Sequence, residues 1–249
     1  MEKLNRRQFL GSAFAACCMP TIGKGDEVSE FDKCKNDILY FVDNYLEVND
    51  QLYGKLKMTP QQREYLKGIS TTPDYFFCAK GRQIGISTAN CVFAYWKTLF
   101  FGEKEHVWIV CCNKGMCKCT CDKYYTIGNT GVFVHPDQCF PSSIARVHFI
   151  TPDGLRGIDW HDRNNTFILD EFEFWNDNWG DKETQRTLYS NLMNPLFVKD
   201  APELFKKCAC NFIVVSTPNC KNSFFNTLVN WYDKSRSLVL PSPTRGLKA

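Results

Sequence analysis

Hydrophobic residues recur along this chain with two periods, one typical of amphipathic helices and one typical of buried strands. Over 29–46 they return at steps of three and four residues, which predicts one helix. A second helix is expected to begin at Thr59-Pro60-Gln61-Gln62, because threonine is a good N-cap, proline suits the first turn and the second glutamine completes a capping box. A third helix is predicted over 87–101.

Short apolar runs fall between these helical segments and are bounded by polar residues, glycine or proline. A strand followed by a parallel strand needs a helical crossover, so their alternation predicts βαβ units and an α/β fold. We expect a mostly parallel sheet with helices on both faces. The expected strands are 75–79, 106–112, 146–150, 166–170 and 212–215, with a helix after the second strand to about residue 125 and further helices at 183–193 and 221–233.

Composition is that of an ordinary globular protein. The chain has 249 residues, of which 44% are hydrophobic and 23% charged, and this excludes disordered, collagen-like and coiled-coil proteins. The longest apolar runs, 8–19 and 91–101, are shorter than the roughly 18 residues that cross a bilayer, so we expect no membrane span. A net charge of +3 permits a modest phosphate-contacting face without requiring one.

Fourteen cysteines are scattered along the chain, some of them adjacent, without the spacing of a zinc knuckle. In the densest stretch, Cys117 and Cys121 would share one face of a helix while Cys119 points elsewhere. We expect reduced thiols that act as small hydrophobic residues. The start of the chain offers another interpretation, because Arg6-Arg7 followed by mildly apolar residues is similar to a twin-arginine export signal. The alternative function is therefore an exported, cysteine-rich redox or metal-binding protein.

The segment Lys80-Gly81-Arg82-Gln83-Ile84-Gly85-Ile86-Ser87-Thr88 lies between a predicted strand and a predicted helix. A phosphate-binding loop needs converging backbone N–H groups, a glycine, a lysine for the terminal phosphates and a hydroxyl for Mg²⁺. Gly85 and Ser87 fit the end of the usual pattern, but Ile86 stands in the lysine position. Lys80 stands at the first-glycine position, from which it can reach the same phosphates, and Arg82 adds a second cation. A plain turn capped by Ser87 is the alternative.

Two further strands are expected to end in polar side chains at the same edge of the sheet. Asp170 and Glu171 follow the apolar run 166–169, where the first carboxylate can hold Mg²⁺ and the second can orient a water that attacks the γ-phosphate. Ser216, Thr217 and Asn219 follow the run 212–215 and can sense that phosphate. The three segments together predict a P-loop NTPase of the ASCE or RecA-like type.

The same segments resemble the large subunit of tailed-phage terminases over about residues 30–235. The resemblance rests on the Lys-Gly-Arg-Gln-Ile-Gly-Ile-Ser-Thr loop, the Phe-Ile-Leu-Asp-Glu strand and the Val-Val-Ser-Thr-Pro-Asn motif. Some of these terminases also place the lysine early, which implies the phosphate role for Lys80. The family's adenine-contacting glutamine falls on Gln62. Arg156 is a candidate for contacting a phosphate in its own or a neighbouring subunit, and a surface loop arginine is the alternative.

The resemblance implies a DNA-packaging motor that hydrolyses ATP to move double-stranded DNA into a capsid. Lys80 and Arg82 would stabilise phosphate charge, Ser87 and Asp170 would position Mg²⁺, and Glu171 would orient the water. DNA would be held through its phosphates without sequence recognition. The implied partners are a homo-oligomeric ring on a capsid portal and a small terminase subunit, in the host bacterial cytoplasm. The nucleotide contacts expected are Gln62, residues 80–88, Ser216, Thr217 and Asn219.

The expected organisation is an N-terminal extension over 1–28, an ATPase domain over 29–240 and a basic tail over 241–249. The family's nuclease domain is not expected, because the residues after Glu171 are needed to finish the ATPase sheet. Two other interpretations remain beside packaging and export. One is a helicase-like P-loop ATPase, and the other is a nucleotide-binding scaffold without turnover, since Ile86 replaces the usual lysine.

Overall fold

The structure is a computed structural model that describes residues 29–46, 49–50, 54–55, 57–72, 75–101, 105–130, 146–155, 158, 164–175, 211–217 and 237–241. The main strands are β3 (Tyr75–Lys80), β4 (His106–Val110), β5 (Val147–Ile150), β6 (Asn165–Asp170), β7 (Asn211–Ser216) and β8 (Ser237–Leu240). The helices are α2 (Glu30–Asn36), α3 (Ile38–Tyr45), α4 (Pro60–Thr71), α5 (Ile86–Phe100) and α6 (Lys114–Thr130), with 3₁₀ turns η2 (Pro152–Leu155) and η3 (Phe172–Trp175) and a small antiparallel pair, β1 (Asn49–Asp50) and β2 (Gly54–Lys55).

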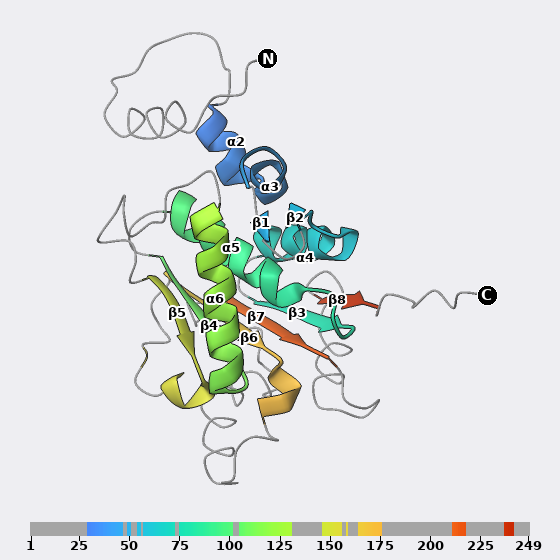
Figure 1. Cartoon of the computed structure of the whole chain (residues 1–249), viewed down its shortest axis with the longest axis vertical. Helices are drawn as coiled ribbons and strands as arrows, with labels where there is room; N and C mark the ends of the chain where they lie inside the picture. Colours follow the sequence, from blue (N-terminus) through green and yellow to red (C-terminus); the bar gives the residue numbers. More distant parts are fainter. Residues whose placement is uncertain are drawn as a thin grey trace, which may run out of the picture.

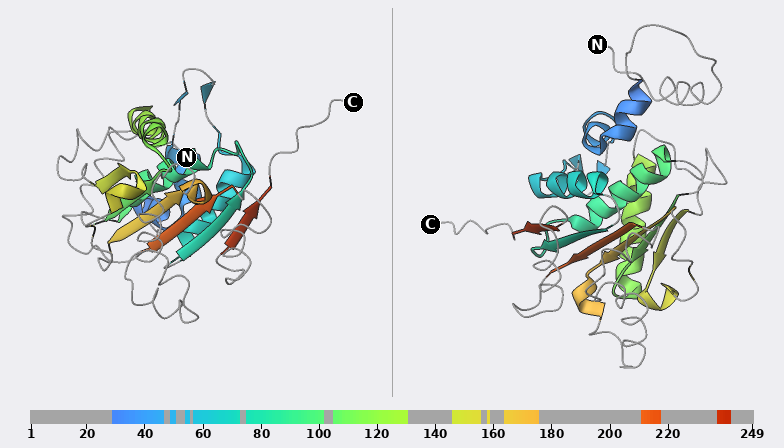
Figure 2. Two further views of the ribbon diagram at one scale, coloured as in Figure 1. Left: turned by 90° about the horizontal axis from the view of Figure 1, so that it is seen from below. Right: turned by 180° about the vertical axis from the view of Figure 1, so that it is seen from behind.

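The six main strands form one sheet in the order β5-β4-β6-β7-β3-β8 (Figures 1 and 2). Every neighbouring pair in it is parallel. β7 lies between β3 and β6, although it follows both in the chain. The carboxyl ends of these three strands therefore meet at one edge of the sheet, and that edge carries the polar segments singled out in the sequence.

Each face of the sheet packs into its own hydrophobic core. One core joins inward residues of the strands, such as Phe76, Ile109 and Ile168, to helices α2–α6, which lie on that side of the sheet in Figure 1. The other core holds the alternate strand residues, such as Phe77 and Phe167, and the described segments that close it include η2 and η3. Strands buried on both faces explain the continuous apolar runs in the sequence.

The helix predicted over 29–46 is two helices, and that prediction was wrong at one residue. Asp37 adopts an extended conformation with φ −137° and ψ 104°, which ends α2 and begins α3. Its carboxylate accepts hydrogen bonds from the N–H groups of Leu39 and Tyr40. An aspartate that caps the next helix competes with helical continuation, and the three- and four-residue periodicity alone does not reveal this competition.

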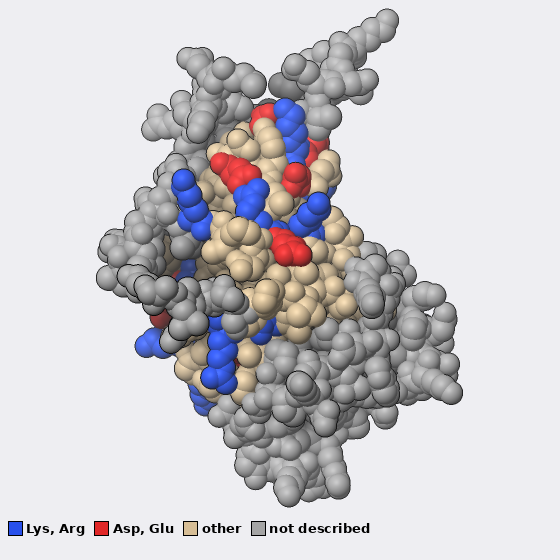
Figure 3. Space-filling model, turned by 90° about the vertical axis from the view of Figure 1, so that its right-hand side faces the viewer, with Lys and Arg blue, Asp and Glu red and all other residues tan. Residues whose placement is uncertain are grey.

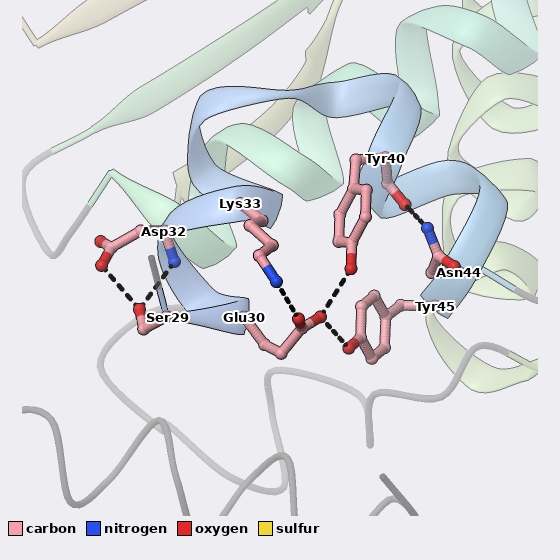
Figure 4. A network of polar contacts seen from close by, with 7 residues as sticks. All are labelled: Ser29, Glu30, Asp32, Lys33, Tyr40, Asn44 and Tyr45. Carbon is pink, nitrogen blue, oxygen red and sulfur yellow. Dashed lines mark hydrogen bonds and ion pairs between the residues drawn. The ribbon is translucent and has the colours of Figure 1, made fainter. Parts of the chain in front are cut away.

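The partly exposed carboxylate of Glu30 holds these two helices together (Figure 4). Glu30 accepts hydrogen bonds from the hydroxyls of Tyr40 and Tyr45 at 2.7 and 2.8 Å and forms an ion pair with Lys33 at 2.7 Å. These donors lower the pKa of Glu30 to about 2, because all of them favour its ionised form. The contact replaces the continuous helix that the sequence pattern predicts.

The remaining elements follow the sequence prediction closely. The capping box at Thr59 and Gln62 is confirmed, as are the predicted strands and the helix after Gly85, within one or two residues. The helix after Asn113 is also present, but it continues to Thr130 and does not end near residue 125 as expected. β8 was not predicted, and its pairing with β3 is a long-range contact. The helices predicted at 183–193 and 221–233, the export-like segment at 1–28 and the tail beyond 241 lie outside the described residues. No helix in the described part of the chain has the length and hydropathy of a membrane span.

Candidate nucleotide site

The loop after β3 has the backbone conformation that a close approach to a ligand requires. Gly85 has φ +77° and sits at the N-cap of α5, where the N–H groups of Thr88 and Ala89 donate to its carbonyl. A Cβ atom at Gly85 would lie 2.3 Å from Nε2 of Gln62, so no side chain fits there without displacing that amide. Gln83 also has a positive φ, of 63°. The loop is thus a tight turn that opens onto the N-terminus of a helix of fifteen residues.

Ser87 and Asp170 meet across the space between α5 and β6. The Ser87 hydroxyl donates a hydrogen bond of 2.9 Å to Oδ2 of Asp170. Asp170 is 1% exposed, and this burial raises the pKa of its carboxyl, while the ammonium of Lys80 and the hydrogen bond from Ser87 oppose the rise. The carboxylate of Asp170 and the hydroxyl of Ser87 together offer two hard oxygen ligands. A bound cation would compensate the unfavourable burial of the negative charge on Asp170.

Lys80 and Glu171 form an ion pair at the same edge. The ammonium of Lys80 lies 2.5 Å from Oε1 of Glu171 and 3.2 Å from the hydroxyl of Thr217. The backbone N–H of Thr217 donates to the other carboxylate oxygen of Glu171 at 3.3 Å. Glu171 itself has φ +52°, a conformation that non-glycine residues rarely adopt. The carboxylate of Glu171, which directly follows β6, is therefore bound by Lys80 at the end of β3 and by Thr217 directly after β7.

Gln62 joins helix α4 to the loop. Its Nε2 donates a hydrogen bond of 3.0 Å to the carbonyl of Gly85, and its Oε1 accepts one of 2.8 Å from the N–H of Thr59. Next to it, Arg63 forms a two-bond ion pair with Asp43 of α3, at 2.5 and 2.9 Å. The resemblance assigned adenine contact to Gln62, and here both ends of its amide bind protein groups.

The other residues expected in the site have different surroundings. The side chains of Ile84 and Ile86 are buried in the core on the helical side of the sheet, so only their backbone groups face the loop. Arg82 and Gln83 are exposed at the turn. Gly81 donates its N–H to the carbonyl of Leu240 on β8. Asn219 and Arg156, both singled out in the sequence, lie outside the described residues.

A hydrogen bond that the sequence does not predict holds the backbone at Asp170, the last residue of β6. The indole N–H of Trp175, in η3, donates a hydrogen bond of 3.0 Å to the carbonyl of Asp170. Trp175 is buried in the second core and so fixes the backbone at the point where it turns to Glu171. The pattern of hydrophobic residues gives no signal for this contact, because η3 is a single turn without periodicity.

The structure describes eight of the fourteen cysteines. All eight cysteines in the described part of the chain are free thiols, and most of them are buried. Cys119 is exposed, while Cys117 and Cys121 are partly buried on the other side of α6. Within the described ranges, no group of three or more cysteine, histidine or acidic residues could hold a metal ion. The thiol-based metal site of the alternative interpretation therefore has no support from these residues.

Comparison with known proteins bears on the fold. No model of a protein family matches the sequence, and no curated protein matches it. Among solved structures, the chain is similar to the UvsW helicase from bacteriophage T4, with a TM-score of 0.52, 9% sequence identity and coverage of 97% of this chain and 82% of that chain. At this identity the likeness concerns the arrangement of elements alone. Together with the all-parallel sheet and the loop after β3, it decides the architecture.

The chain has the fold of an α/β P-loop NTPase. Two further structures align less well, another of T4 UvsW and a DEAD box protein from the hyperthermophile Methanococcus jannaschii, with TM-scores of 0.49 and 0.41 and identities of 10% and 12%. They cover 97% and 87% of this chain, which spans 47% and 55% of their lengths. In a P-loop fold, the loop after β3 and the end of β6 occupy the edge where ligands bind to open α/β sheets.

The donor set at this edge fits ATP and Mg²⁺. Oxygen atoms of a hydroxyl and a carboxylate are the ligands that Mg²⁺ prefers, and Ser87 and Asp170 present them within hydrogen-bond distance of each other. The turn at Gly85 leaves no room for a Cβ, and the N-terminus of α5 begins directly after it. Lys80 supplies a buried positive charge from the start of the loop.

Proposed function

We propose that this chain binds ATP with Mg²⁺ and hydrolyses it at the carboxyl edge of the sheet. The observation that carries the proposal is the convergence of Lys80, Ser87, Asp170 and Glu171, which come from two segments far apart in the chain. Hydrolysis of a phosphoanhydride depends mainly on positioning and on electrostatic stabilisation, and this set supplies one cation and two carboxylates for those tasks. A structural ion pair alone does not account for the additional Ser87–Asp170 contact.

Each side chain has a distinct role in this proposal. Ser87 and Asp170 would hold Mg²⁺, which supplies charge neutralisation between the terminal phosphates. Lys80 would move its hydrogen bonds from Glu171 to phosphate oxygens. Glu171, freed from the ammonium but still bound by the N–H of Thr217, would orient the attacking water and accept its proton. Arg82, exposed at the turn, is the second cation available to the phosphates.

The ATPase is proposed to act as a DNA-packaging motor that moves double-stranded DNA. This finer assignment is supported by the early lysine of the loop and by the Ser-Thr-Pro-Asn sequence after β7, both of which resemble the terminase large subunit. Its expected partners are a capsid portal, a small terminase subunit and further copies of the chain in a ring. A helicase-type ATPase is the second candidate, and the similarity in fold to the T4 UvsW helicase favours it.

The two candidates differ in what they do to a duplex. A packaging motor moves along intact double-stranded DNA, so it would displace the third strand of a DNA triplex without separating the duplex beneath. A helicase would instead separate the strands of a forked duplex. We would measure both reactions with the full chain, ATP and Mg²⁺, with Glu171→Gln as the inactive control. Triplex displacement alone supports packaging, unwinding alone supports the helicase, and the absence of DNA-stimulated hydrolysis contradicts both.

The face shown in Figure 3 carries charges of both signs among the described residues. On the side shown in Figure 3, basic and acidic side chains of the described residues are interspersed over the upper part of the molecule and do not merge into one continuous basic area. Binding of duplex phosphates by scattered lysines and arginines is weak and strongly dependent on salt. We therefore expect DNA stimulation of the ATPase to fall steeply as the salt concentration rises.

A further inference from the structure

Helix α4 is joined to the N-terminal part of α5 by two buried side chains. Gln62 and Tyr65 lie three residues apart on α4, so they share one side of that helix. The amide of Gln62 donates to the carbonyl of Gly85 at 3.0 Å, and the hydroxyl of Tyr65 donates to Oδ1 of Asn90 at 2.6 Å. These bonds reach the N-cap and the second turn of α5, against which α4 packs (Figure 1). The first of them acts directly on the loop after β3.

The bond from Gln62 helps to aim a backbone N–H group toward the expected phosphates. The carbonyl of Gly85 also accepts from the N–H groups of Thr88 and Ala89, so the three donors together fix its direction. The described residues contain no cis peptide bond, and in a trans peptide the N–H points away from the carbonyl. The N–H of Ile86 therefore points out of the N-terminus of α5, the end of a helix that binds anions.

The same amide is poorly placed to recognise a base. Pairing with adenine uses the oxygen and the nitrogen of a glutamine amide at once. In Gln62, Oε1 already accepts from the N–H of Thr59 and Nε2 is bound to Gly85, while only 5% of the residue is exposed. The amide keeps one further lone pair and one further N–H. With so little exposed surface, a base could reach them only by displacing one of the protein partners.

The N-terminus of α4 is itself held in place, which makes it a suitable anchor. Thr59 and Gln62 form a capping box, and the guanidinium of Arg63 forms a two-bond ion pair with Asp43 of α3. A side chain can position a neighbouring group well only if its own conformation is fixed by its surroundings. Gln62 meets this condition, because both ends of its amide and the first turn of its helix are bound.

We propose that Gln62 is a positioning residue that fixes the turn at Gly85, and thereby the affinity of the loop for a triphosphate, without selecting the base. This inference rests on the proposed function, since it concerns the same nucleotide site. Loss of the bond to Gly85 should weaken binding of a triphosphate without a base by the same factor as binding of an ATP analogue. Recognition of adenine by Gln62 would instead weaken binding of the ATP analogue alone.

Gln62→Glu separates the two bonds of the amide. Glutamate completes a capping box as glutamine does, so it can still accept from the N–H of Thr59. An ionised carboxylate has no donor for the carbonyl of Gly85 and places a second acceptor against it. We would titrate the full chain at pH 8 by calorimetry with the Mg²⁺ complexes of AMP-PNP, which resists hydrolysis, and of inorganic tripolyphosphate. Both affinities should fall about tenfold, as expected for one lost hydrogen bond.

Tyr65→Phe is the matched control, because it removes the other bond between α4 and α5 without touching the loop. It should lower the melting temperature and leave both affinities unchanged. Amide hydrogen exchange of the chain without nucleotide gives a readout that does not depend on the proposed function. Exchange over residues 81–89 should be faster in Gln62→Glu than in Tyr65→Phe, since only the first variant frees the turn at Gly85.

The outcomes separate this inference from the proposed function. A loss of affinity confined to AMP-PNP, an equal loss in Tyr65→Phe, unchanged exchange in Gln62→Glu, or binding of AMP-PNP without any binding of tripolyphosphate would each overturn the positioning role alone. If the unaltered chain bound neither probe, the proposed function would be overturned together with it.

Discussion

The ammonium of Lys80 is held between Glu171 and Thr217, with Oε1 of the carboxylate at 2.5 Å and the hydroxyl at 3.2 Å. The lysine side chain is 6% exposed, so its charge is compensated by the carboxylate and not by solvent. Phosphate oxygens that enter this edge must compete with Glu171 for the same ammonium. The proposed phosphate-binding cation, Lys80, is therefore paired with the proposed base, Glu171. Glu171 becomes available to a water molecule only when Lys80 binds phosphate oxygens and releases it.

Lys80→Ala should lower the rate of ATP hydrolysis by about a hundredfold or more, as loss of one preorganised electrostatic contact does at other active sites. The substitution also leaves Glu171 without its ion-pair partner. We would measure steady-state hydrolysis together with nucleotide affinity. Lys118→Ala, at an exposed position of α6, is a matched control for the loss of a lysine. Full activity of Lys80→Ala would show that another residue is the phosphate-binding cation.

Ile86→Lys is not expected to rescue that variant. Ile86 occupies the lysine position of the usual phosphate-loop pattern, but its side chain is 2% exposed and packs in the hydrophobic core. A lysine there would bury an unpaired charge, which is strongly unfavourable. We expect the double variant Lys80→Ala, Ile86→Lys to unfold at a lower temperature than Lys80→Ala, as measured by calorimetry. Recovery of hydrolysis in the double variant would contradict this account of the loop.

Glu171→Gln should still bind ATP but hydrolyse it about a hundredfold more slowly, because a general base contributes roughly 10²–10⁴ in rate. Glutamine is almost the same size and can still accept the hydrogen bond from the N–H of Thr217. Binding of a fluorescent ATP analogue and release of phosphate separate the two effects. The scaffold interpretation predicts no hydrolysis in the unaltered chain, so measurable turnover there would exclude it. Unchanged turnover in Glu171→Gln would remove Glu171 from the proposed mechanism.

Gly85→Ala should weaken nucleotide binding and lower the free energy of unfolding by about 1–2 kcal/mol, since left-handed φ angles are unfavourable for residues with a Cβ. Its Cβ would also meet the amide of Gln62. Adding Gln62→Ala should relieve this second effect and leave the first. Gly115→Ala, near the start of α6, is the control: its Cβ would lie 3.2 Å from Oδ1 of Asn113, but alanine suits a helix, so we expect a smaller cost than at Gly85. Urea denaturation of the four chains measures these differences.

Glu30→Gln tests the contact between α2 and α3. The folded pKa of Glu30 is about 2, below its ordinary value of 4.5, so its ionised form stabilises the folded chain above pH 4.5 and this contribution disappears as the pH falls toward 2. Because the side chain is partly exposed, we expect a loss of about 1 kcal/mol at pH 7. The difference from the unaltered chain should shrink at pH 3. An equal difference at both pH values would mean that the charge of Glu30 is not what stabilises the contact.

The sequence predicts the parts of this fold that depend on local patterns. The capping box at Thr59 and Gln62, the strand that ends at Asp170 and the helix after Gly85 all follow from nearby residues, and the structure has each of them. The break at Asp37 and the pairing of β8 with β3 could not be found in the same way. The break occurs because the carboxylate of Asp37 caps the next helix, where the backbone could instead have continued as one helix. The pairing of β8 with β3 joins residues that are far apart in the chain.

The candidate site shows the same division. The residue types at Lys80, Ser87, Asp170 and Glu171 and their places at strand ends could be recognised from the sequence. Which groups touch could not, because the sequence does not give the order of strands in the sheet. The bond from Gln62 to Gly85 is an example, since the resemblance to the terminases implied a contact with adenine and the folded chain brings the amide onto the loop.

Because β7 lies between β3 and β6, the residue that follows it contacts the ends of both neighbouring strands. Lys80 and Glu171 stand on the strands at either side of it, and Thr217 touches both as it leaves the sheet. If phosphate oxygens draw the ammonium of Lys80 away from Glu171, we expect its bond to the hydroxyl of Thr217 to break as well, while the N–H of Thr217 keeps its bond to Glu171. The contacts of Thr217, the residue that directly follows β7, therefore depend on whether Lys80 and Glu171 are paired.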